Sequence, residues 1–255
     1  KINKIIKKIR TPHKFGFTGT MPEDLLDQWN IIGKIGPILY ERNSFQLRRD
    51  NYVAGAKIQV IKIEYNDKPK IFPADRYDPS ARYRRELDFS SKNSFRNEVI
   101  SKLCGKFDNN CLILVDYISH GEELYNNLTS VCKNKQVYFI RGEVPVEERD
   151  KVKSLMERTK DVICIAISKI FSTGINIKNL HYIMFASGGK AKIKIIQSIG
   201  RGLRKHKDKQ DVIIIDIADK LHYGYQHLCK RLKHYKNERI IYGIKEIKEP
   251  KETKS

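Results

Sequence analysis

Long apolar runs and paired cysteines are both missing from this 255-residue chain. No apolar run approaches the roughly 18 residues that span a bilayer, and no apolar signal-peptide stretch follows the basic start. The five cysteines are odd in number and form no Cys-x-x-Cys pair, which argues against a disulfide framework and against a zinc site. We therefore expect a soluble, cytoplasmic protein with reduced thiols and no bound metal.

Basic residues dominate the charge of the chain. There are 50 lysines and arginines against 30 aspartates and glutamates, and the formal net charge is +20, which is typical of proteins that bind polyanions. The composition is 40% hydrophobic with 13 tyrosines and 10 phenylalanines, too apolar for a disordered basic tail. The length suits one large domain, or one domain with part of another. Because the chain starts at Lys1 in mid-pattern, we expect a fragment.

Five continuous apolar runs without polar alternation mark buried strands in the second half of the sequence. They cover residues 111–116, 136–141, 162–167, 181–186 and 212–217. The segments between them are long enough for crossover helices, and the segment Ser119-His120-Gly121-Glu122 has the spacing of a capping box. Alternating strands and helices predict a mostly parallel sheet covered on both faces. In such sheets the functional loops collect at the carboxyl ends of the strands.

The remaining segments suggest how the chain is divided. Residues 1–14 combine basic side chains with isoleucines at helical spacing, and residues 60–65 alternate weakly like an edge or linker strand. Three prolines between residues 68 and 80 mark a boundary, and the Lys/Glu-rich end from Lys245 onward is expected to fray. The predicted parts are an N-terminal piece (1–45), a linker with a strand (46–80), an α/β domain (81–240) and a charged tail (241–255).

The stretch 197–204, with the sequence Gln-Ser-Ile-Gly-Arg-Gly-Leu-Arg, carries the clearest chemical signal. Its apolar residues form a helical stripe, so Arg201 and Arg204 project together from the other side. Two guanidiniums at this spacing can clamp one phosphate group with bidentate hydrogen bonds. The alternative is a solvated basic helix face. Gly200 and Gly202 argue against that alternative, because each glycine costs a helix roughly 1 kcal/mol relative to alanine.

Two further stretches with hydroxyl groups and glycine follow apolar runs. Ser172-Thr173-Gly174-Ile175-Asn176 comes after the run 162–167 and can offer hydroxyls and backbone amides to a phosphate, although an ordinary connecting turn is equally compatible. Thr18-Gly19-Thr20 follows Phe15-Gly16-Phe17. Alone, it predicts a cap at Thr20 for a helix that begins nearby.

In this order and spacing, the stretches resemble the C-terminal half of a superfamily-two helicase. Thr18-Gly19-Thr20 resembles motif III, 112–124 motif IV, Arg141-Gly142-Glu143 motif IVa, 168–179 motif V and 197–204 motif VI. The amino-acid sequences of four short segments are most similar to those of a bacteriophage recombination helicase. The segments are 118–121, 171–175, 178–181 and 203–206. The resemblance implies a RecA-like three-layer α/β sandwich with a mostly parallel sheet, preceded by the tail end of a first RecA-like domain. It also implies DNA as the nucleic-acid partner.

The resemblance further implies roles for single residues. Arg201 and Arg204 would act as the catalytic arginines on ATP that is held with Mg²⁺ mainly by the first domain. The residues expected near the nucleotide are Gln197, Gly174, Asn176 and Gly200. The residues expected to contact nucleic acid are Ser119, His120, Gly142, Ser172 and Thr173, and for His120 a simple role at the helix start is an equal alternative. Thr18, Gly19 and Thr20 would couple nucleotide state to strand binding.

Three departures from the family pattern limit these expectations. Asn176 stands where many relatives have aspartate, and Ser198 replaces a common arginine. The sequence contains no Gly-Lys-Ser/Thr and no Asp-Glu dipeptide, so the P-loop lysine and the magnesium-holding carboxylates are absent. We therefore expect that this chain alone does not hydrolyse ATP, and that it needs the upstream first RecA-like domain as a partner.

The predicted function is the C-terminal motor half of an ATP-dependent DNA helicase or translocase that remodels branched or duplex DNA in recombination, repair or replication. One alternative is the motor part of a restriction-type duplex translocase. Another is a non-catalytic, basic nucleic-acid-binding module with a RecA-like fold, against which the pair Arg201 and Arg204 argues, because a pure binder has no need of that geometry. If the gene belongs to a phage, the expected location is the host cytoplasm.

Overall fold

The structure is a computed structural model that describes residues 10–18, 21–22, 24–42, 44–50, 55–141, 145–168, 177, 179–187 and 211–251. The chain divides into two compact units, residues 1–43 (unit one) and 44–255 (unit two). Within the described ranges, no helix is both long and apolar enough to cross a membrane. The five cysteines are free thiols, and four of them are buried.

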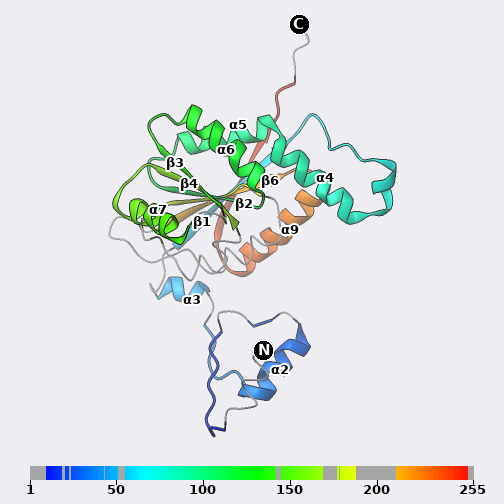
Figure 1. Ribbon diagram of the computed structural model, residues 1–255. Coiled ribbons are helices and arrows are strands. Elements are labelled where there is room, and N and C mark those ends of the chain that lie inside the picture. Colours follow the sequence, from blue (N-terminus) through cyan, green and yellow to red (C-terminus); the bar gives the residue numbers. More distant parts are fainter. Residues whose placement is uncertain are drawn as a thin grey trace. The chain divides into compact units, whose positions relative to one another are not determined.

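Unit one contains helix α2 (Leu25–Ile35), shown in Figure 1. Its N-cap is Asp24, whose carboxylate accepts hydrogen bonds from the backbone amides of Leu26 at 2.8 Å and Asp27 at 3.2 Å. The cap predicted at Thr20 is therefore misplaced by four positions. A carboxylate that accepts two first-turn amides is the stronger N-cap.

Helix α2 has no buried residue. Trp29 is 66% exposed and Leu26 is 67% exposed, and Phe17, outside the helix, is 97% exposed. The described part of unit one thus keeps most of its large apolar side chains at the surface. The isoleucines whose spacing predicts a helix near the start of the chain, from Ile2 to Ile9, lie outside the described residues.

Unit two contains a seven-stranded sheet with the order β3-β4-β2-β5-β6-β1-β7, in which every described pairing is parallel (Figure 1). The strands are β1 (Gly55–Glu64), β2 (Cys111–Val115), β3 (Gln136–Ile140), β4 (Val162–Ile167), β5 (Tyr182–Phe185), β6 (Asp211–Asp219) and β7 (Ile241–Lys248). The helices are α3 (Ser44–Arg49), the 3-10 helix η1 (Pro73–Tyr77), α4 (Pro79–Lys92), α5 (Ser94–Gly105), α6 (Ile118–Val131), α7 (Val146–Arg158) and α9 (His222–Asn237). The predicted α/β class with a parallel sheet is confirmed.

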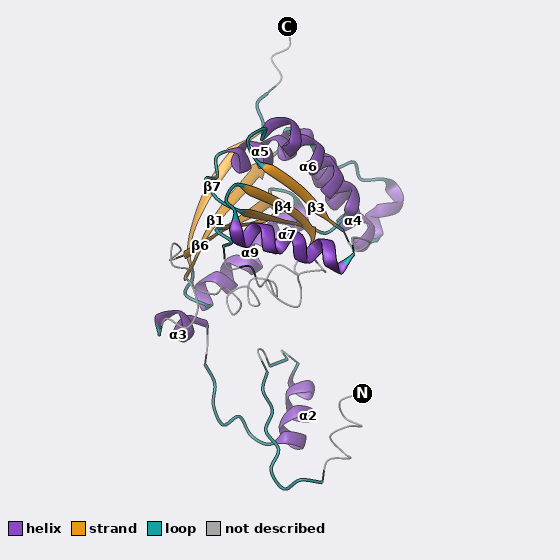
Figure 2. Ribbon diagram, turned by 60° about the vertical axis from the view of Figure 1, so that its left-hand side comes forward, coloured by secondary structure: helices purple, strands orange, loops and turns teal. Residues whose placement is uncertain are grey.

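Each face of the sheet carries its own apolar core. Helices α5 and α6 pack on one face, where Ile100 and Leu124 meet the strands. Helices α7 and α9 pack on the other, where Met156 and Leu228 do the same (Figure 2). Strand β2 is buried along its whole length, because it lies near the middle of the sheet and helices cover both of its faces. This explains why the predicted strands were continuous apolar runs.

The sheet also includes strands from the predicted linker (46–80) and the predicted tail (241–255). Strand β1 lies between β6 and β7 and buries alternate residues on both faces, so it is not an edge strand. Strand β7 pairs with it in register from Lys57 with Ile241 to Glu64 with Lys248. The prediction that the chain frays from Lys245 is therefore wrong as far as Lys248. The prediction took the charges of β7 as a sign of disorder, whereas they form cross-strand ion pairs such as Lys62 with Glu246.

Candidate functional site

Most of the predicted site residues lie outside the described part of the chain. They are Gly19, Thr20, Gly142, Ser172, Thr173, Gly174, Asn176, Gln197, Gly200, Arg201 and Arg204. Thr18 is described as an exposed residue of unit one, and Ser119 and His120 lie side by side in the first turn of α6. The structure therefore defines the frame from which the motif segments leave the sheet.

The predicted motif V segment is anchored at both of its ends. Ser168, directly after β4, is buried, and its hydroxyl donates to the carbonyl of Val115 at 3.1 Å. At the other end, the side-chain amide of Asn179 donates to the carbonyl of Thr159 at 3.0 Å, and the carbonyl of Asn179 accepts from Nδ2 of Asn110 at 3.1 Å. Ser168 lies at the carboxyl ends of the strands, because it follows β4, and Asn179 lies at their amino ends, because it precedes β5.

The predicted motif VI segment lies between β5 and β6, and its departure point is also fixed. The carbonyl of Ala186, just after β5, accepts a hydrogen bond from Arg96 at 2.5 Å. The hydroxyl of Ser187 accepts one from the backbone amide of Asp116 at 2.7 Å. The turn after β2 and the turn after β5 are thereby joined at the carboxyl edge of the sheet, where parallel α/β sheets bind their ligands.

Ser119 is exposed at this edge, but it does not form the predicted capping box. Helix α6 begins after Tyr117, which serves as N-cap without a side-chain hydrogen bond, so Ser119 is the second residue of the helix. Glu122, the expected box partner, instead accepts from Nη1 of Arg141 at 2.8 Å and ties α6 to the end of β3. The first-turn amides are thus not capped by a side chain, and such amides suit a phosphate.

His120 is buried rather than presented to a ligand. Its ring is 2% exposed, and Nε2 lies 3.2 Å from Oδ1 of Asn97 on α5. Burial, together with the nearby charge of Arg96, lowers the pKa of His120 to about 3. The prediction that His120 contacts nucleic-acid phosphate does not fit this position, because a buried neutral imidazole has no surface for a phosphate. Its contact with Asn97 joins α6 to α5.

Gly121 explains why the start of α6 can lie so close to the sheet. A Cβ atom at this position would lie 2.4 Å from the ring of Phe139 on β3. Only a residue without a side chain permits that approach. Gly121 therefore lets the first turn of α6, which includes Ser119, pack closely against Phe139.

The carboxyl edge of the sheet also holds a buried polar network that the sequence does not predict. Asp219, the last residue of β6, accepts hydrogen bonds from Nε of Arg96 at 2.7 Å and from the hydroxyl of Tyr65 at 2.5 Å. Burial and the charge of Asp219 raise the pKa of Tyr65 well above its ordinary range. Burial opposes the charge of Arg96, but Asp219 outweighs it, so the pKa of Arg96 is raised. In the sequence, only the position of Asp219 at the end of an apolar strand hinted at this network. Its partners Arg96 and Tyr65 lie more than a hundred residues away and could not be predicted.

A second network of the same composition lies on the opposite face of β6. Asp216 is fully buried and accepts from Nε of Arg231 and from the hydroxyl of Tyr235, both at 2.8 Å. Both donors belong to α9. This network fixes α9 against the sheet, whereas the network of Asp219 joins the ends of several elements.

A family model matches the middle part of the chain. Residues 95–206 match the family described as "Helicase conserved C-terminal domain". The match covers the first turns after β2, β3 and β4 and reaches the end of the predicted motif VI. Together with the parallel sheet, this match confirms the resemblance of unit two to the C-terminal domain of superfamily-two helicases.

The ATP-dependent DNA helicase uvsW of Enterobacteria phage T4 is 31% identical to this chain over 257 residues, which cover 92% of the chain and 49% of that protein. The crystal structure of T4 UvsW matches with a TM-score of 0.63 at 29% identity, over 88% of this chain and 45% of that one. The structure of S. cerevisiae Dbp5 bound to RNA and ADP BeF3 matches with a TM-score of 0.57 at 12% identity, over 91% and 50%. At that identity Dbp5 shows the RecA-like fold alone. The chain spans about half the length of these relatives.

Proposed function

We propose that this chain is the C-terminal motor half of an ATP-dependent superfamily-two DNA helicase or translocase. The observation that carries the proposal is the combined match of residues 95–206 to the helicase C-terminal domain and of nearly the whole chain to a phage DNA helicase. The complete protein would remodel branched or duplex DNA in recombination, repair or replication. Residues 1–45 would be the end of the first RecA-like domain, and the main part of that domain would lie upstream.

The catalytic contribution of this half would come from Arg201 and Arg204. Arginines that reach a γ-phosphate stabilise the charge that develops in phosphoryl transfer, by factors of ~10³ to 10⁵ where this has been dissected. Gln197, Gly200, Gly174 and Asn176 would line the nucleotide side of the same cleft. The fixed departure points at Ser168 and Ala186 support this reading, because arginines of this kind act only when their backbone is held in place.

ATP is proposed to be held with Mg²⁺ mainly by the upstream domain. The donor set of this chain fits one side of the nucleotide, since guanidiniums and backbone amides suit phosphate oxygens. It does not fit the metal, because the chain has no P-loop lysine motif or Asp-Glu pair, and the described residues hold no cluster of three metal-ligating side chains. Bound ATP supplies the energy of the cycle. The residues of this half would complete the site when the two domains close.

DNA is proposed to lie along the carboxyl edge of the sheet of unit two. Ser119 is exposed there at an α6 start without a side-chain cap, and Gly142, Ser172 and Thr173 belong to segments that begin at the same edge. The net charge of +20 supports sequence-independent, salt-dependent affinity for the phosphate backbone. We do not extend this role to His120, which is buried. Thr18, Gly19 and Thr20 would couple the two domains.

The helicase match does not favour the binding-module alternative. A protein of the proposed kind acts on DNA in the cytoplasm, or in the host cytoplasm if the gene is carried by a phage. Translocation without strand separation, as in a restriction-type motor, uses the same motifs and would be distinguished by an unwinding assay on forked DNA.

The test is ATP turnover by the purified 255-residue chain, with and without DNA, repeated after the polypeptide encoded immediately upstream is added. We expect no turnover by the chain alone and DNA-stimulated turnover by the pair. An inactive pair that still binds DNA would overturn the motor proposal and favour the binding module.

A further inference from the structure

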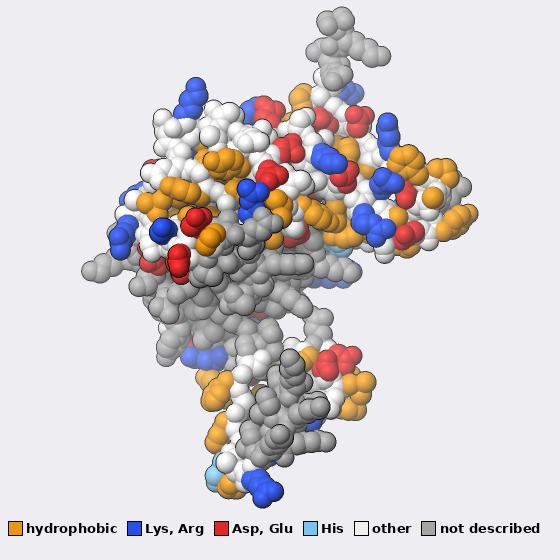
Figure 3. Space-filling view, in the orientation of Figure 1, with side chains coloured by type: hydrophobic (Ala, Val, Ile, Leu, Met, Phe, Trp, Pro, Cys, Tyr) orange, Lys and Arg blue, Asp and Glu red, His pale blue; other side chains and the backbone are white. Residues whose placement is uncertain are grey.

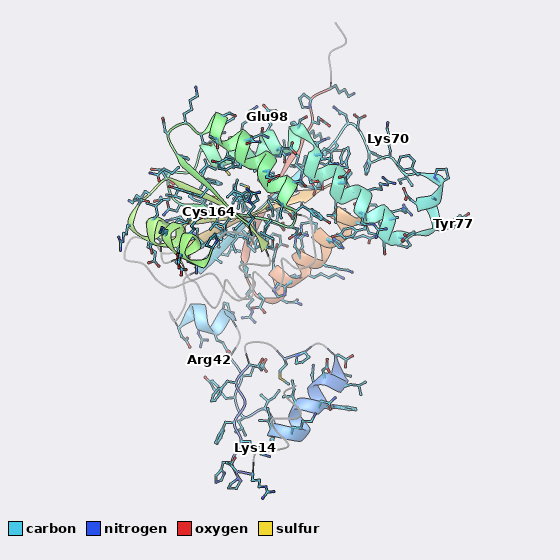
Figure 4. All side chains as sticks on the ribbon, in the orientation of Figure 1. Lys14, Arg42, Lys70, Tyr77, Glu98 and Cys164 are labelled. Carbon is cyan, nitrogen blue, oxygen red and sulfur yellow. The ribbon has the colours of Figure 1, made fainter. Side chains whose placement is uncertain are left out.

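The segment between β1 and α4 is not part of any helicase motif discussed above. We call residues 66–85 the β1–α4 projection. It leaves the sheet at the carboxyl end of β1, forms the short helix η1 and returns as the first turns of α4. Figure 1 shows it extending from the sheet beside the start of α4, and Figure 4 labels Lys70 and Tyr77 on it.

Hydrogen bonds hold the projection in one shape. The carboxylate of Asp75 is buried, and its Oδ2 accepts from the amide of Phe72 and from Nε of Arg85, both at 3.1 Å. Asp78 caps α4 by accepting from the amides of Ser80 at 2.8 Å and Ala81 at 3.1 Å. The projection is therefore ordered by polar contacts, although it contains large apolar side chains that could have formed a core.

Helix α4, which continues from the projection, is fixed to helix α9 of unit two. Glu86 on α4 accepts hydrogen bonds from the first-turn amides of α9, with Tyr223 at 2.9 Å and Gly224 at 3.1 Å. Tyr83 packs edge-on against Tyr223 and His227. Rings and charges carried on the projection are thus presented at a constant position.

Large apolar side chains of the projection point into solvent. Tyr77 is 88% exposed, Ile71 is 56% exposed and Phe72 is 48% exposed. The guanidinium of Arg85 lies 4.5 Å from the centre of the Phe72 ring and holds that ring from one side. Exposed apolar side chains that are grouped and held in place are typical of a binding surface.

The same segment carries exposed cations. They are Lys68, Lys70 and Arg84, of which Arg84 lies 3.7 Å from the carboxylate of Asp78. Figure 3 shows basic, acidic and hydrophobic side chains interleaved over this part of the molecule. Aromatic rings set among cations are the combination that binds exposed nucleic-acid bases and their phosphates. Residues 66–85 contain six lysines and arginines against three aspartates, and this excess of positive charge favours a polyanion over an apolar protein partner.

The projection lies next to the edge at which DNA is proposed to bind. Helix α4 contacts α6, whose first turn carries Ser119. Burial raises the pKa of Tyr83 on α4, and the carboxylate of Asp116, in the turn between β2 and α6, raises it further. A strand that touched Ser119 would therefore meet the projection on the same side of the sheet.

We propose that the β1–α4 projection is a second DNA contact, in which Tyr77 and Phe72 stack on unpaired bases at a junction between single and double strands. Lys68, Lys70 and Arg84 contact the adjacent phosphates. This inference rests on the proposed function, because it takes DNA as the partner of the neighbouring edge.

The experiment measures the binding of the full 255-residue chain to forked DNA by fluorescence anisotropy at low salt. Tyr77→Ala should weaken binding about tenfold, as expected for one lost stacked base, and Tyr77→Phe should restore it, because the ring is kept. The matched control is Tyr242→Ala, which removes a partly exposed tyrosine at the amino end of β7, on the opposite edge of the sheet. Lys68→Gln with Lys70→Gln should reduce the salt dependence of binding.

A second readout places the contact directly. A fork with 5-iodouracil at its first unpaired position, irradiated in the complex, should crosslink to Tyr77 or Phe72, as mass spectrometry of the peptides would show. Binding that is unchanged in Tyr77→Ala, with crosslinks elsewhere, would overturn the inference, leave the proposed function standing and point to a protein partner for the projection. A wild-type chain that does not bind the fork at all would overturn both.

Discussion

Two buried carboxylates on strand β6 have the same kinds of partner but hold different parts of the molecule. Asp216 accepts from an arginine and a tyrosine of one helix, α9, within 19 residues of itself. Asp219 accepts from Arg96 and Tyr65, which lie 123 and 154 residues away in the sequence. The same chemistry therefore serves local docking on one face of the sheet and long-range joining on the other.

The two networks differ in that only the Asp219 network makes polar contacts between elements far apart in the sequence. Arg96 donates to the carbonyl of Ala186 as well as to Asp219, so one guanidinium links α5, the end of β5 and the end of β6. Those strand ends flank the predicted motif VI. Buried ion pairs often add little net stability relative to apolar packing, but they specify one arrangement of the elements they join. We infer that the Asp219 network positions the motif segments and that the Asp216 network holds a helix.

Removal of either carboxylate should have the largest effect on stability. Asp219→Ala and Asp216→Ala each leave a guanidinium buried without its partner, and the free energy of unfolding should fall by about 3 to 5 kcal/mol. Urea unfolding followed by circular dichroism measures this. A loss below about 1 kcal/mol at either position would mean that the network there does not hold the fold.

Removal of a single hydroxyl sharpens the comparison. Tyr235→Phe should cost about 2 kcal/mol, because it deletes a hydrogen bond to a fully buried carboxylate. Tyr65→Phe should cost less, since Tyr65 is only partly buried and water can replace its hydroxyl at the sheet edge. Equilibrium unfolding of the two variants gives both values. An equal or larger cost for Tyr65→Phe would contradict the view that the Asp219 network is the more accessible of the two.

The pH dependence of stability provides a third test, on the face of the sheet that carries Asp219. His120 has its pKa lowered to about 3 by burial and by Arg96, while the unfolded chain has the ordinary value near 6.5. The unfolded state therefore binds the extra proton first. The stability due to neutral His120 is present above pH 6.5 and is lost as the pH falls toward 3.

Between pH 7 and pH 5, the wild-type chain should lose roughly 1 to 2 kcal/mol more stability than His120→Gln, which cannot titrate. Unfolding midpoints at the two pH values measure the difference, and the subtraction removes the common titration of the carboxylates. Equal losses in the two proteins would show that the ring is not buried in its neutral form.

The sequence predicted the buried strands well because their signal is local. Cys111 to Val115 and Val162 to Ile167 are apolar at every position, as strands covered on both faces must be. Strand β7 was missed because it lies at the edge, keeps most residues exposed and carries charge. Its position depends on the backbone register with β1, which no local pattern reveals.

The candidate site divides in the same way. The positions of the motif segments in the fold follow from the order of strands, and Ser119 lies at the expected edge. The burial of His120 could not be predicted, because it depends on Asn97 from another helix. The nucleotide-side residues Arg201 and Arg204 lie outside the described residues, and their roles remain proposals.

The most direct test of the proposal that this chain is the C-terminal half of a two-domain motor uses the complete protein carrying Arg204→Ala. Its DNA-stimulated ATP turnover is measured together with its DNA affinity. We expect turnover to fall by about 10³ or more, while DNA affinity stays within about twofold of wild type. Lys102→Ala, which removes an exposed cation on α5, should change neither value and serves as the control. Turnover that is unchanged, or a parallel loss of DNA affinity, would contradict the assignment of Arg204 to the nucleotide.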